Sequence, residues 1–400
     1  MVATCARSTD ETRTHADRSP TTSVAKDAQG KPEAGTDVRP LRLDATDERI
    51  ASLKVPQSFA VNVFARDLGH PRMLATGDDG TIYVSRPDTS DVVALKDGDG
   101  DGRAEQKRVM AGPPGVHGIA VRRRELWMAN ATEIYVASIE SNGSLGLRHR
   151  LIRGLPGGKE HLERTLGFGP DDMLYVSVGS SCNACAEVNP QHATILRIGG
   201  DAKPKIFARG LRNTIGFDWH PDTHELWGMD NGTDGRGDDA PPEELNRLRE
   251  GADYGWPYAY GKREVDTVMD DPPSTTKKAY AEHTEPAALE YQAHSAPIAM
   301  VFYRGTQFPP DYRGDAFVAM HGSWNRDPPT GYKVVRIRFD RGAPIGFEDF
   351  LSGFLVDAQG AFGRPTGLAV AKDGALLVSD DSNGLIYRVS YETTGARADP

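Results

Sequence analysis

The chain lacks several features that would place it in a common protein class. No apolar run in its 400 residues approaches the roughly 20 residues of a membrane-spanning helix. Lys and Arg (47) are outnumbered by Asp and Glu (57), which gives a formal net charge of −10. Because nucleic-acid binding requires a basic surface, this balance argues against a nucleic-acid partner. No helical period persists along the sequence, so a helical fold is not expected.

Cysteine is also scarce, with Cys5 near the start and the pair Cys182 and Cys185 in the sequence SSCNAC. A single Cys-x-x-Cys could be half of a zinc site, a redox pair or a short-loop disulfide. No His follows Cys185 to suggest covalent haem, and no second pair completes a zinc tetrahedron. We therefore favour a structural disulfide or two inert thiols. For Cys5 we favour a free thiol over a lipoprotein cysteine.

The two ends of the chain differ from its centre. Residues 1–40 are rich in Thr, Ser, Asp, Lys and Pro and hold few large apolar side chains, so we predict a disordered tail. Residues 41–395 are predicted to form one folded domain, with 396–400 as a short second tail. No hydrophobic signal-peptide core occurs near the start, so either a leader is absent from this sequence or the protein is cytoplasmic.

One phrase recurs six times along the chain. It consists of a turn with Arg, His or Pro, an apolar strand, a polar turn and a second strand that ends in small polar residues. The copies begin near Arg72, His117, Arg164, Arg212, Pro297 and Arg364. The early spacings match one four-stranded propeller blade, and the wider later spacings indicate long loops in copies four and five. The sequence therefore predicts an all-β, six-bladed β-propeller rather than a pair of β-sandwiches.

In a propeller, the loops that lead into the inner strands meet at one mouth of the central channel. The repeat places a set of basic and polar residues there: His117, His161, Arg164, Arg212, Asn213, His294 and Arg364. Arg and His side chains around one pocket suit an anionic ligand.

The segment 210–257 carries the densest chemistry. It opens with Arg212 and Asn213, continues through an acidic loop that ends in Glu243 and Glu244, and closes with Asp-Tyr-Gly-Trp-Pro. Closely spaced carboxylates repel one another unless a hard cation lies among them, and Ca²⁺ prefers such oxygen ligands. A solvated acidic loop is the alternative. A second acidic stretch, 97–102, reads as half of an EF-hand loop, for which weak calcium binding and a plain hairpin are equally good interpretations.

These motifs resemble the soluble pyrroloquinoline quinone (PQQ)-dependent sugar dehydrogenases, in particular the glucose/sorbosone dehydrogenase branch. The likeness rests on the Arg-Asn pair, the Asp-Asn-Gly loop, Pro-Glu-Glu-Leu-Asn and Asp-Tyr-Gly-Trp-Pro, and it extends from about Val55 to Tyr391. It implies PQQ and Ca²⁺ as cofactors, with His161 and Arg212 as catalytic residues. The remaining implied contacts are cofactor-binding Arg212, Asn213, His294, Trp324, Arg326 and Arg364, and metal-binding Gly232, Thr233, Glu243, Glu244 and Tyr254.

Two positions depart from the glucose enzyme. Where that enzyme has an Asp that orients the catalytic His, this chain has Ser180, and where it has a Gln after the Arg, this chain has Ile215. Substrate preference and the strength of the base are therefore open. The motif His-Gly-Ser-Trp-Asn-Arg, ending at Arg326, is closer to the sorbosone branch, and a structural role for Trp324 is the alternative to stacking on a planar ligand.

The resemblance implies that the protein oxidises an aldose or a sugar aldehyde by hydride transfer to PQQ, with His161 as general base. An external cytochrome or quinone would accept the electrons, in the periplasm or outside the cell, and a homodimer is left open. Two alternatives remain: a calcium-dependent propeller lactonase or esterase, and a propeller that binds a partner without catalysis.

Overall fold

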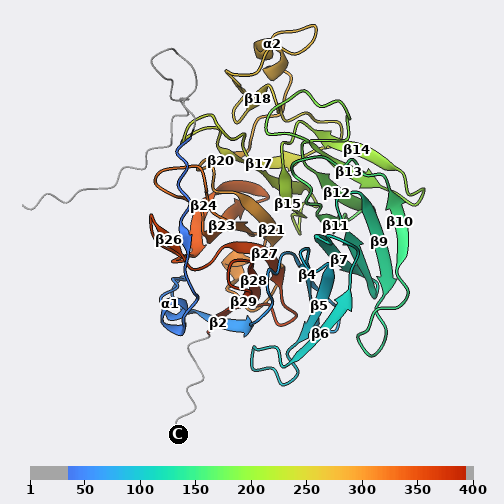
Figure 1. The fold of residues 1–400 in the computed structure, drawn as a ribbon, viewed down its shortest axis with the longest axis vertical. Helices are drawn as coiled ribbons and strands as arrows, with labels where there is room; N and C mark the ends of the chain where they lie inside the picture. The colour runs from blue at the N-terminus through green and yellow to red at the C-terminus, as the bar shows by residue number, and fades with distance from the viewer. Residues whose placement is uncertain (1–34, 393–400) are drawn as a thin grey trace, which may run out of the picture.

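The structure, a computed structural model, describes residues 35–392, and these residues are almost entirely strands and loops (Figure 1). Helix is confined, within that range, to α1 (Asp47–Ala51), α2 (Lys277–Ala281) and the 3₁₀ turn η1 (Pro310–Tyr312). The all-β prediction is therefore confirmed. Most of the predicted first tail and the predicted second tail lie outside the described residues, as does Cys5.

Six sheets of four antiparallel strands make up most of the chain between residues 35 and 392. Each of the first five follows chain order, and the sixth takes its outermost strand from the start of the domain. The first sheet contains β3 (Leu74–Thr76), β4 (Ile82–Arg86), β5 (Asp91–Lys96) and β6 (Gln106–Ala111), and the second β7 (Gly118–Arg122), β8 (Glu125–Ala129), β9 (Glu133–Ser138) and β10 (His149–Arg153). The third contains β11 (Leu166–Phe168), β12 (Leu174–Val178), β13 (Thr194–Ile198) and β14 (Pro204–Arg209), and the fourth β15 (Thr214–Trp219), β16 (Leu226–Asp230), β17 (Glu243–Leu248) and β20 (Leu289–Tyr291). The fifth contains β21 (Pro297–Phe302), β22 (Ala316–Met320), β23 (Lys333–Asp340) and β24 (Ala343–Leu351), and the sixth β27 (Pro365–Val370), β28 (Leu376–Asp380), β29 (Leu385–Tyr391) and β2 (Phe59–Ala65).

The sheets surround a common centre (Figure 1). Neighbouring sheets contact one another in a cycle: β3 contacts β7, β7 contacts β11, β12 contacts β15, β15 contacts β21, β21 contacts β27, and β27 contacts β3 again. The first strand of each sheet begins at or within two residues of a repeat start read from the sequence. The repeat thus located the first strand of each of these sheets.

The two ends of the domain are joined in the sixth sheet. The early strand β2 pairs antiparallel with β29, with Phe59 opposite Tyr391 and Val61 opposite Val389. The Phe59 ring also packs edge-on against Phe308, with centroids 4.8 Å apart. Closing the ring in this way covers strand edges that would otherwise be open to pairing.

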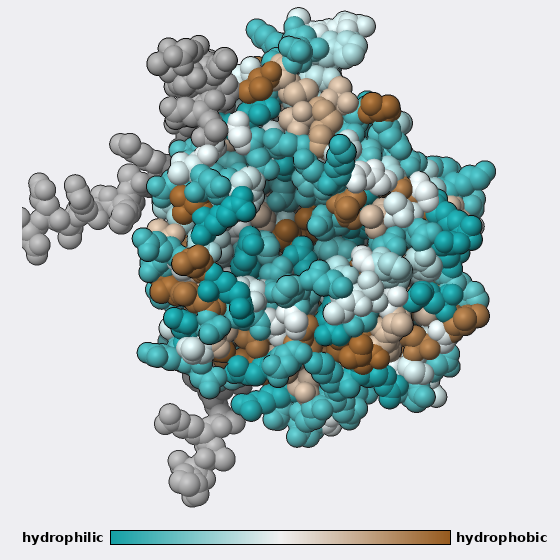
Figure 2. Space-filling view, viewed as in Figure 1, coloured by the Kyte–Doolittle hydropathy of each residue, from teal (hydrophilic) through white to brown (hydrophobic). Residues whose placement is uncertain are grey.

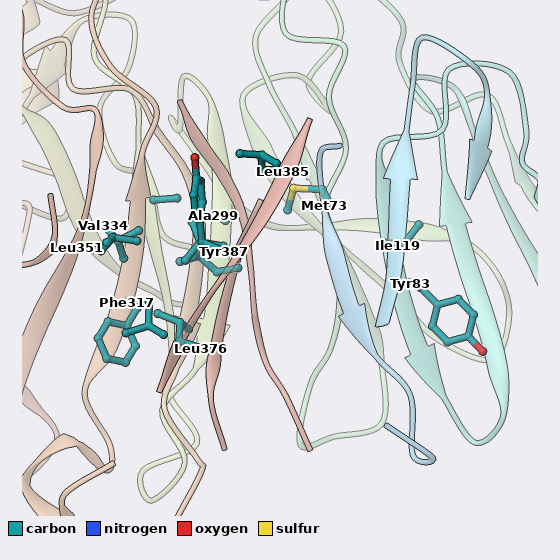
Figure 3. Packing of buried hydrophobic residues seen from close by; sticks show 14 of the residues in the cluster. Met73, Tyr83, Ile119, Ala299, Phe317, Val334, Leu351, Leu376, Leu385 and Tyr387 are labelled. Atoms are coloured by element: carbon teal, nitrogen blue, oxygen red, sulfur yellow. The ribbon is translucent and has the colours of Figure 1, made fainter. Parts of the chain in front are cut away.

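The core lies between adjacent sheets rather than in one central layer. Strands β12, β16, β22 and β28, the second strands of their sheets, are buried along their whole length. Such strands are covered on both faces, so their sequences are mostly apolar and lack a regular alternation of polar and apolar residues. Figure 3 shows part of the largest cluster, which joins Met73, just before β3, to Ala299 of the fifth sheet and to Leu376 and Tyr387 of the sixth sheet.

The long loops predicted for copies four and five are present. A two-stranded sheet of β18 (Ala259–Tyr260) and β19 (Glu264–Val265) and the helix α2 are inserted between β17 and β20. After β24, strands β25 (Leu355–Asp357) and β26 (Gly360–Ala361) form a small sheet with β1 (Leu41–Arg42). None of the helices in residues 35–392 has the length and apolar character needed to cross a membrane.

Candidate functional site

His161 lies in the loop before β11, with its ring held by one neighbour. Nδ1 is 2.9 Å from the hydroxyl of Ser180 and 3.1 Å from the Ser180 carbonyl oxygen. A carbonyl can only accept, so Nδ1 carries the proton and Nε2 keeps its lone pair. The backbone of His161 has a φ of +49°, a conformation uncommon outside glycine that is often found at functional sites.

The charge state of His161 follows from its surroundings. Burial and the neighbouring charge of Arg212 lower the pKa of His161 to about 4. Glu163 and Asp234 act in the opposite direction but do not outweigh these effects. The imidazole is therefore neutral near pH 7, which is the form that accepts a proton.

Arg212 is buried at the start of β15, and its guanidinium is held by Asn183 and Asp234. Nε donates to the Asn183 carbonyl at 3.0 Å, and Nη2 donates to Asn183 Oδ1 at 2.9 Å and to Asp234 Oδ2 at 2.8 Å. Nη1 has only a 3.4 Å contact, with the Asn231 carbonyl. The side chain is thus fixed in orientation and retains a weakly used donor.

Asn213 and His294, both predicted to bind the cofactor, are buried and already engaged with the protein. The Asn213 N–H donates to Asp230, and its carbonyl accepts from Asn231. His294 Nε2 donates to the Gly237 carbonyl at 2.8 Å, and its Nδ1 lies 3.1 Å from Asn325 Nδ2. In this structure His294 therefore supports the loop between β16 and β17.

The three predicted cofactor-binding residues from the loops of the fifth and sixth sheets have different environments. The Arg326 guanidinium is buried and bonds to the carbonyl of Asp238 and to the Asp239 carboxylate. Trp324 is 43% exposed, and the Arg39 guanidinium lies 4.9 Å from its ring centroid. Arg364 donates to the carbonyls of the His321-Gly322 turn. Trp324 and Arg364 line one surface pocket of about 320 Å³, whereas Arg326 does not line it.

A larger cavity of about 500 Å³ lies beside the His161 loop and includes residues that were not predicted as site residues. It is lined by Arg72, His117, Glu163 and Asp381, which come from different sheets of the ring. The Asp381 carboxylate lies 2.6 Å from Arg72 Nη1 and 3.0 Å from His321 Nε2. Arg72 stands at a repeat start and could have been assigned from that signal, whereas Asp381 follows a strand and carries no such signal.

In this cavity, His117 has a buried ring nitrogen that is available to a ligand. Its Nδ1 lies 3.0 Å from the Arg164 carbonyl and therefore donates to it, while the buried Nε2 has no hydrogen-bond partner. Burial lowers the pKa of His117 to about 4, so Nε2 is an acceptor. Arg164 itself was expected at the mouth, but it is fully buried and bonds to backbone carbonyls, including that of Pro156.

Two consecutive glutamates predicted to bind metal point to opposite faces of β17. Glu243 accepts hydrogen bonds from the N–H groups of Gly232 and Ala296. Glu244 instead accepts from Gly261 and from Asn246. Neighbouring residues in a strand alternate in direction, so one ion cannot be chelated by both carboxylates.

Four of the five predicted metal-site residues line one small cavity of about 20 Å³, namely Gly232, Thr233, Glu244 and Tyr254. Burial raises the pKa of Glu244 to about 8, as expected for a carboxyl without a cation beside it. Close to this carboxyl, oxygens of Asn246, Glu264 and Glu290 are buried and have no hydrogen-bond partner. Unsatisfied buried oxygens are suitable ligands for a hard cation. The Tyr254 hydroxyl donates to the Arg247 carbonyl, which leaves its own carbonyl as the available ligand.

The Cys-x-x-Cys pair forms a disulfide between Cys182 and Cys185. This outcome selects one of the two alternatives left open by the sequence. In the acidic stretch 97–102, the Asp97 carboxylate accepts from the N–H groups of Gly100 and Gly102, so the loop is braced by its own backbone.

Viewed as in Figure 1, the face of the protein is mostly hydrophilic and is hollowed near its centre (Figure 2). Within residues 35–392 the site residues form four groups: His161 with Arg212, the 500 Å³ cavity around His117, the Glu244 cavity, which Arg212 also lines, and the pocket of Trp324 and Arg364.

The sequence of the chain is similar to one family model and to individual known proteins. The family model described as TrAA12-like matches residues 53–392. An uncharacterized protein from Borreliella burgdorferi is 32% identical over 369 residues, which covers 87% of this chain and 93% of that protein. A PQQ-dependent pyranose dehydrogenase from Coprinopsis cinerea is 34% identical over 113 residues, covering 24% of this chain and 15% of that protein.

Solved structures share the fold. The AA12 protein of Trichoderma reesei, in its iodide structure, superposes with a TM-score of 0.74 at 20% identity over 85% of this chain and 97% of that one. Its calcium structure gives a TM-score of 0.73 at 19% identity, with the same coverage of both chains. The holo PQQ domain of the C. cinerea pyranose dehydrogenase gives a TM-score of 0.73 at 20% identity, covering 85% of this chain and 97% of that domain.

Proposed function

The chain belongs to the TrAA12-like family, and we propose that it is an oxidoreductase that uses PQQ to oxidise an aldose or a sugar aldehyde. The support from relatives is that the pyranose dehydrogenase and its holo PQQ domain share sequence and fold with this chain. The observation that carries the proposal is the pairing of a neutral His161 with a fixed Arg212 at one end of the ring.

As part of this proposal, the six four-stranded sheets are the six blades of a closed β-propeller. The cyclic contacts between neighbouring sheets and the pairing of β2 with β29 support this arrangement. In such a ring, the loops before the first strands share one mouth, so His161 and Arg212 reach the same ligand although 51 positions separate them.

The residues at this mouth fit PQQ, a flat ortho-quinone with three carboxylates. Arg212 retains a weakly used donor at Nη1, and Arg364 and the partly exposed Trp324 line an open pocket. Guanidinium groups suit carboxylates, and an indole suits a planar ring. When bound, PQQ supplies the electron-poor quinone that takes two electrons and a proton from the sugar as a hydride equivalent.

In the reaction, His161 Nε2 accepts the proton of the substrate hydroxyl as the C–H bond breaks. The ring is neutral at working pH, and Ser180 holds Nδ1–H so that Nε2 is the acceptor. Positioned proton transfer of this kind typically contributes about 10² to 10⁴ in rate.

Arg212 would stabilise the negative charge that a bound quinone gains as it accepts the hydride. The guanidinium is buried and held on several sides, so little reorganisation accompanies the reaction. Preorganised donors typically contribute about 3 to 4 kcal/mol each. Loss of Arg212 is therefore expected to cost rate.

Calcium would be held beside Glu244, with the carbonyls of Gly232, Thr233 and Tyr254 as further ligands. The unpartnered oxygens of Glu264 and Glu290 support an oxygen-rich cation site here. The ion would supply fixed positive charge behind Arg212, which lines the same small cavity.

The 500 Å³ cavity has the size of a small-ligand site and presents hydrogen-bonding groups, as a sugar requires. We place the sugar there. Sorbosone and other aldehydes remain candidate substrates, and an external cytochrome or quinone remains the candidate electron acceptor. A periplasmic or secreted location and a homodimer stay predictions.

The function is tested by reconstituting the purified protein with PQQ and Ca²⁺ and measuring reduction of an artificial dye with a panel of aldoses and aldehydes. Dye reduction that depends on both sugar and PQQ is expected. The alternatives, a calcium-dependent lactonase and a non-catalytic binding module, would reduce no dye. Hydrolysis of lactones and aryl esters by the same preparation would then separate these two alternatives.

A further inference from the structure

The disulfide between Cys182 and Cys185 closes a short loop that lies between the two proposed catalytic residues. The loop follows β12 and contains Asn183, whose side chain contacts Arg212 and Asp234. Neither cysteine is needed for the proposed chemistry. The question is therefore what this cross-link holds in place.

The backbone carbonyl of Asn183 and both polar atoms of its side chain form hydrogen bonds with Arg212 and Asp234. Its carbonyl accepts from Arg212 Nε at 3.0 Å, and its Oδ1 accepts from Arg212 Nη2 and from the Asp234 N–H, both at 2.9 Å. Its Nδ2 donates to the Asp234 carbonyl at 3.0 Å. The loop thus fixes the guanidinium of Arg212 and the backbone of Asp234, whose carboxylate pairs with that guanidinium.

The same loop also holds His161 through Ser180. The Ser180 hydroxyl accepts from His161 Nδ1 and donates to the Cys182 carbonyl at 2.7 Å. The Ser180 N–H donates to the Arg212 carbonyl at 2.8 Å. Because Cys182 and Cys185 are covalently linked, the segment 180–185 can present all these partners in one geometry.

We propose that the Cys182–Cys185 loop is a positioning element, released by dithiol reductants, that sets the geometry of His161 and Arg212, with Asn183 as a positioning residue. This inference rests on the proposed function. Both cysteines are partly exposed, so a reductant can reach the sulfur atoms. A dithiol gives two electrons and two protons to the disulfide, which becomes two thiols, while the reductant becomes a cyclic disulfide.

Release of the cross-link gives residues 182–185 additional conformations, so the Asn183 contacts to Arg212 are populated for less of the time. Arg212 would then bind an anionic ligand less well, and the ring of His161 would become more solvated. Both effects are measurable without turnover.

The experiment compares the full-length wild type, oxidised and after reduction with dithiothreitol, with three variants. These are Asn183→Ala, the double variant Cys182→Ala with Cys185→Ala, and Asn62→Ala as a matched control on the exposed face of β2. Excess dithiothreitol is removed without air before PQQ is added, because a dithiol also reduces the quinone. Readouts are the Kd for PQQ from absorbance titration and the pKa of His161 from its NMR signal in protein without PQQ, assigned by its loss in His161→Gln. Far-UV circular dichroism checks folding, and thiol titration checks reduction.

We expect reduction of the wild type to raise the Kd for PQQ about three- to tenfold and to raise the pKa of His161. Asn183→Ala should show the same changes, the double cysteine variant should show them without further response to dithiothreitol, and Asn62→Ala should behave as the wild type. A fully reduced, folded wild type with unchanged Kd and unchanged His161 pKa would overturn the inference. An unchanged Kd in Asn183→Ala would overturn the role of Asn183.

Failure of the proposed function gives a different pattern. If the oxidised wild type binds no PQQ, the cofactor assignment fails, and the His161 titration alone decides the inference. A rise in the His161 pKa on reduction would still support positioning by the loop, and its absence would overturn it.

Discussion

Glu243 and Glu244 are consecutive in β17, yet their carboxylates lie on opposite faces of the sheet. Glu243 bonds to the N–H groups of Gly232 and Ala296, whereas Glu244 lines the small cavity with Tyr254. The sequence predicts that both glutamates bind a cation. Consecutive side chains of a strand point to opposite faces, so only one of the two can reach it. The two side chains therefore form a matched pair for testing the calcium site.

Calcium should raise the melting temperature of the protein, and Glu244→Gln should abolish that increase. Ligand linkage gives about 2.7 kcal/mol of stabilisation at a hundredfold excess of ion over its Kd. Glu243→Gln should lower the baseline stability but keep the calcium-dependent increase. Differential scanning calorimetry with and without a chelator measures this. Equal loss of the calcium response in both variants would contradict the site.

The rate of substrate oxidation should stay near its maximum well into the acidic range. Burial and Arg212 lower the pKa of His161 to about 4, so the base remains unprotonated below the usual histidine pKa of about 6.5. As pH falls through the lowered pKa, the base is protonated and the rate declines. Single-turnover absorbance changes of the quinone against pH measure this limb. A decline centred near pH 6.5 would show that His161 is not in this environment.

His161→Gln should fold normally and bind PQQ, but its hydride-transfer rate should fall by about 10² to 10⁴. The amide can still donate toward Ser180, but it has no basic nitrogen at the position of Nε2. Single-turnover reduction of bound quinone isolates this step from dye reoxidation. A variant that keeps more than about a tenth of the wild-type rate would exclude His161 as the base.

Ser180→Ala should have a smaller effect. The variant removes the hydroxyl that lies 2.9 Å from Nδ1, but the Ser180 carbonyl at 3.1 Å remains as an acceptor. Loss of one neutral hydrogen bond typically costs about 1 kcal/mol, so we expect the rate to fall by up to about tenfold. The same single-turnover assay applies, and a loss as large as that of His161→Gln would mean that the hydroxyl is indispensable.

The repeat in the sequence predicted the first strands closely because each copy carries its own turn and apolar run. Strand β2 could not be found in this way, since its partner β29 is more than 300 positions away and pairing depends on closure of the ring. The dependence on contacts between distant parts of the chain also explains which site residues could be predicted from the sequence. Arg212 stands at a repeat start and His161 lies shortly before the one at Arg164, whereas Asn183 and Asp381 follow second strands and are functional candidates only by their contacts.

The opposite directions of Glu243 and Glu244 could have been anticipated from strand alternation, once the acidic loop was known to continue into a strand. The hydrogen bonds of His294 and Arg326 could not have been anticipated from the sequence. Both bond to the loop between β16 and β17, and that loop has no periodic pattern to indicate its path.

His117→Asn should weaken sugar binding and leave the affinity for PQQ unchanged. The Asn amide can still donate to the Arg164 carbonyl, but the unpartnered Nε2 that lines the 500 Å³ cavity is lost. A single hydrogen bond to a sugar hydroxyl corresponds to about 0.5 to 1.5 kcal/mol, so kcat/KM should fall by about two- to twelvefold, mainly through KM. Steady-state kinetics with several aldoses measure kcat and KM, and the Kd for PQQ measures binding of the quinone. An unchanged KM for every sugar would place the substrate elsewhere at the mouth, and a large fall in kcat would instead make His117 a candidate for the base.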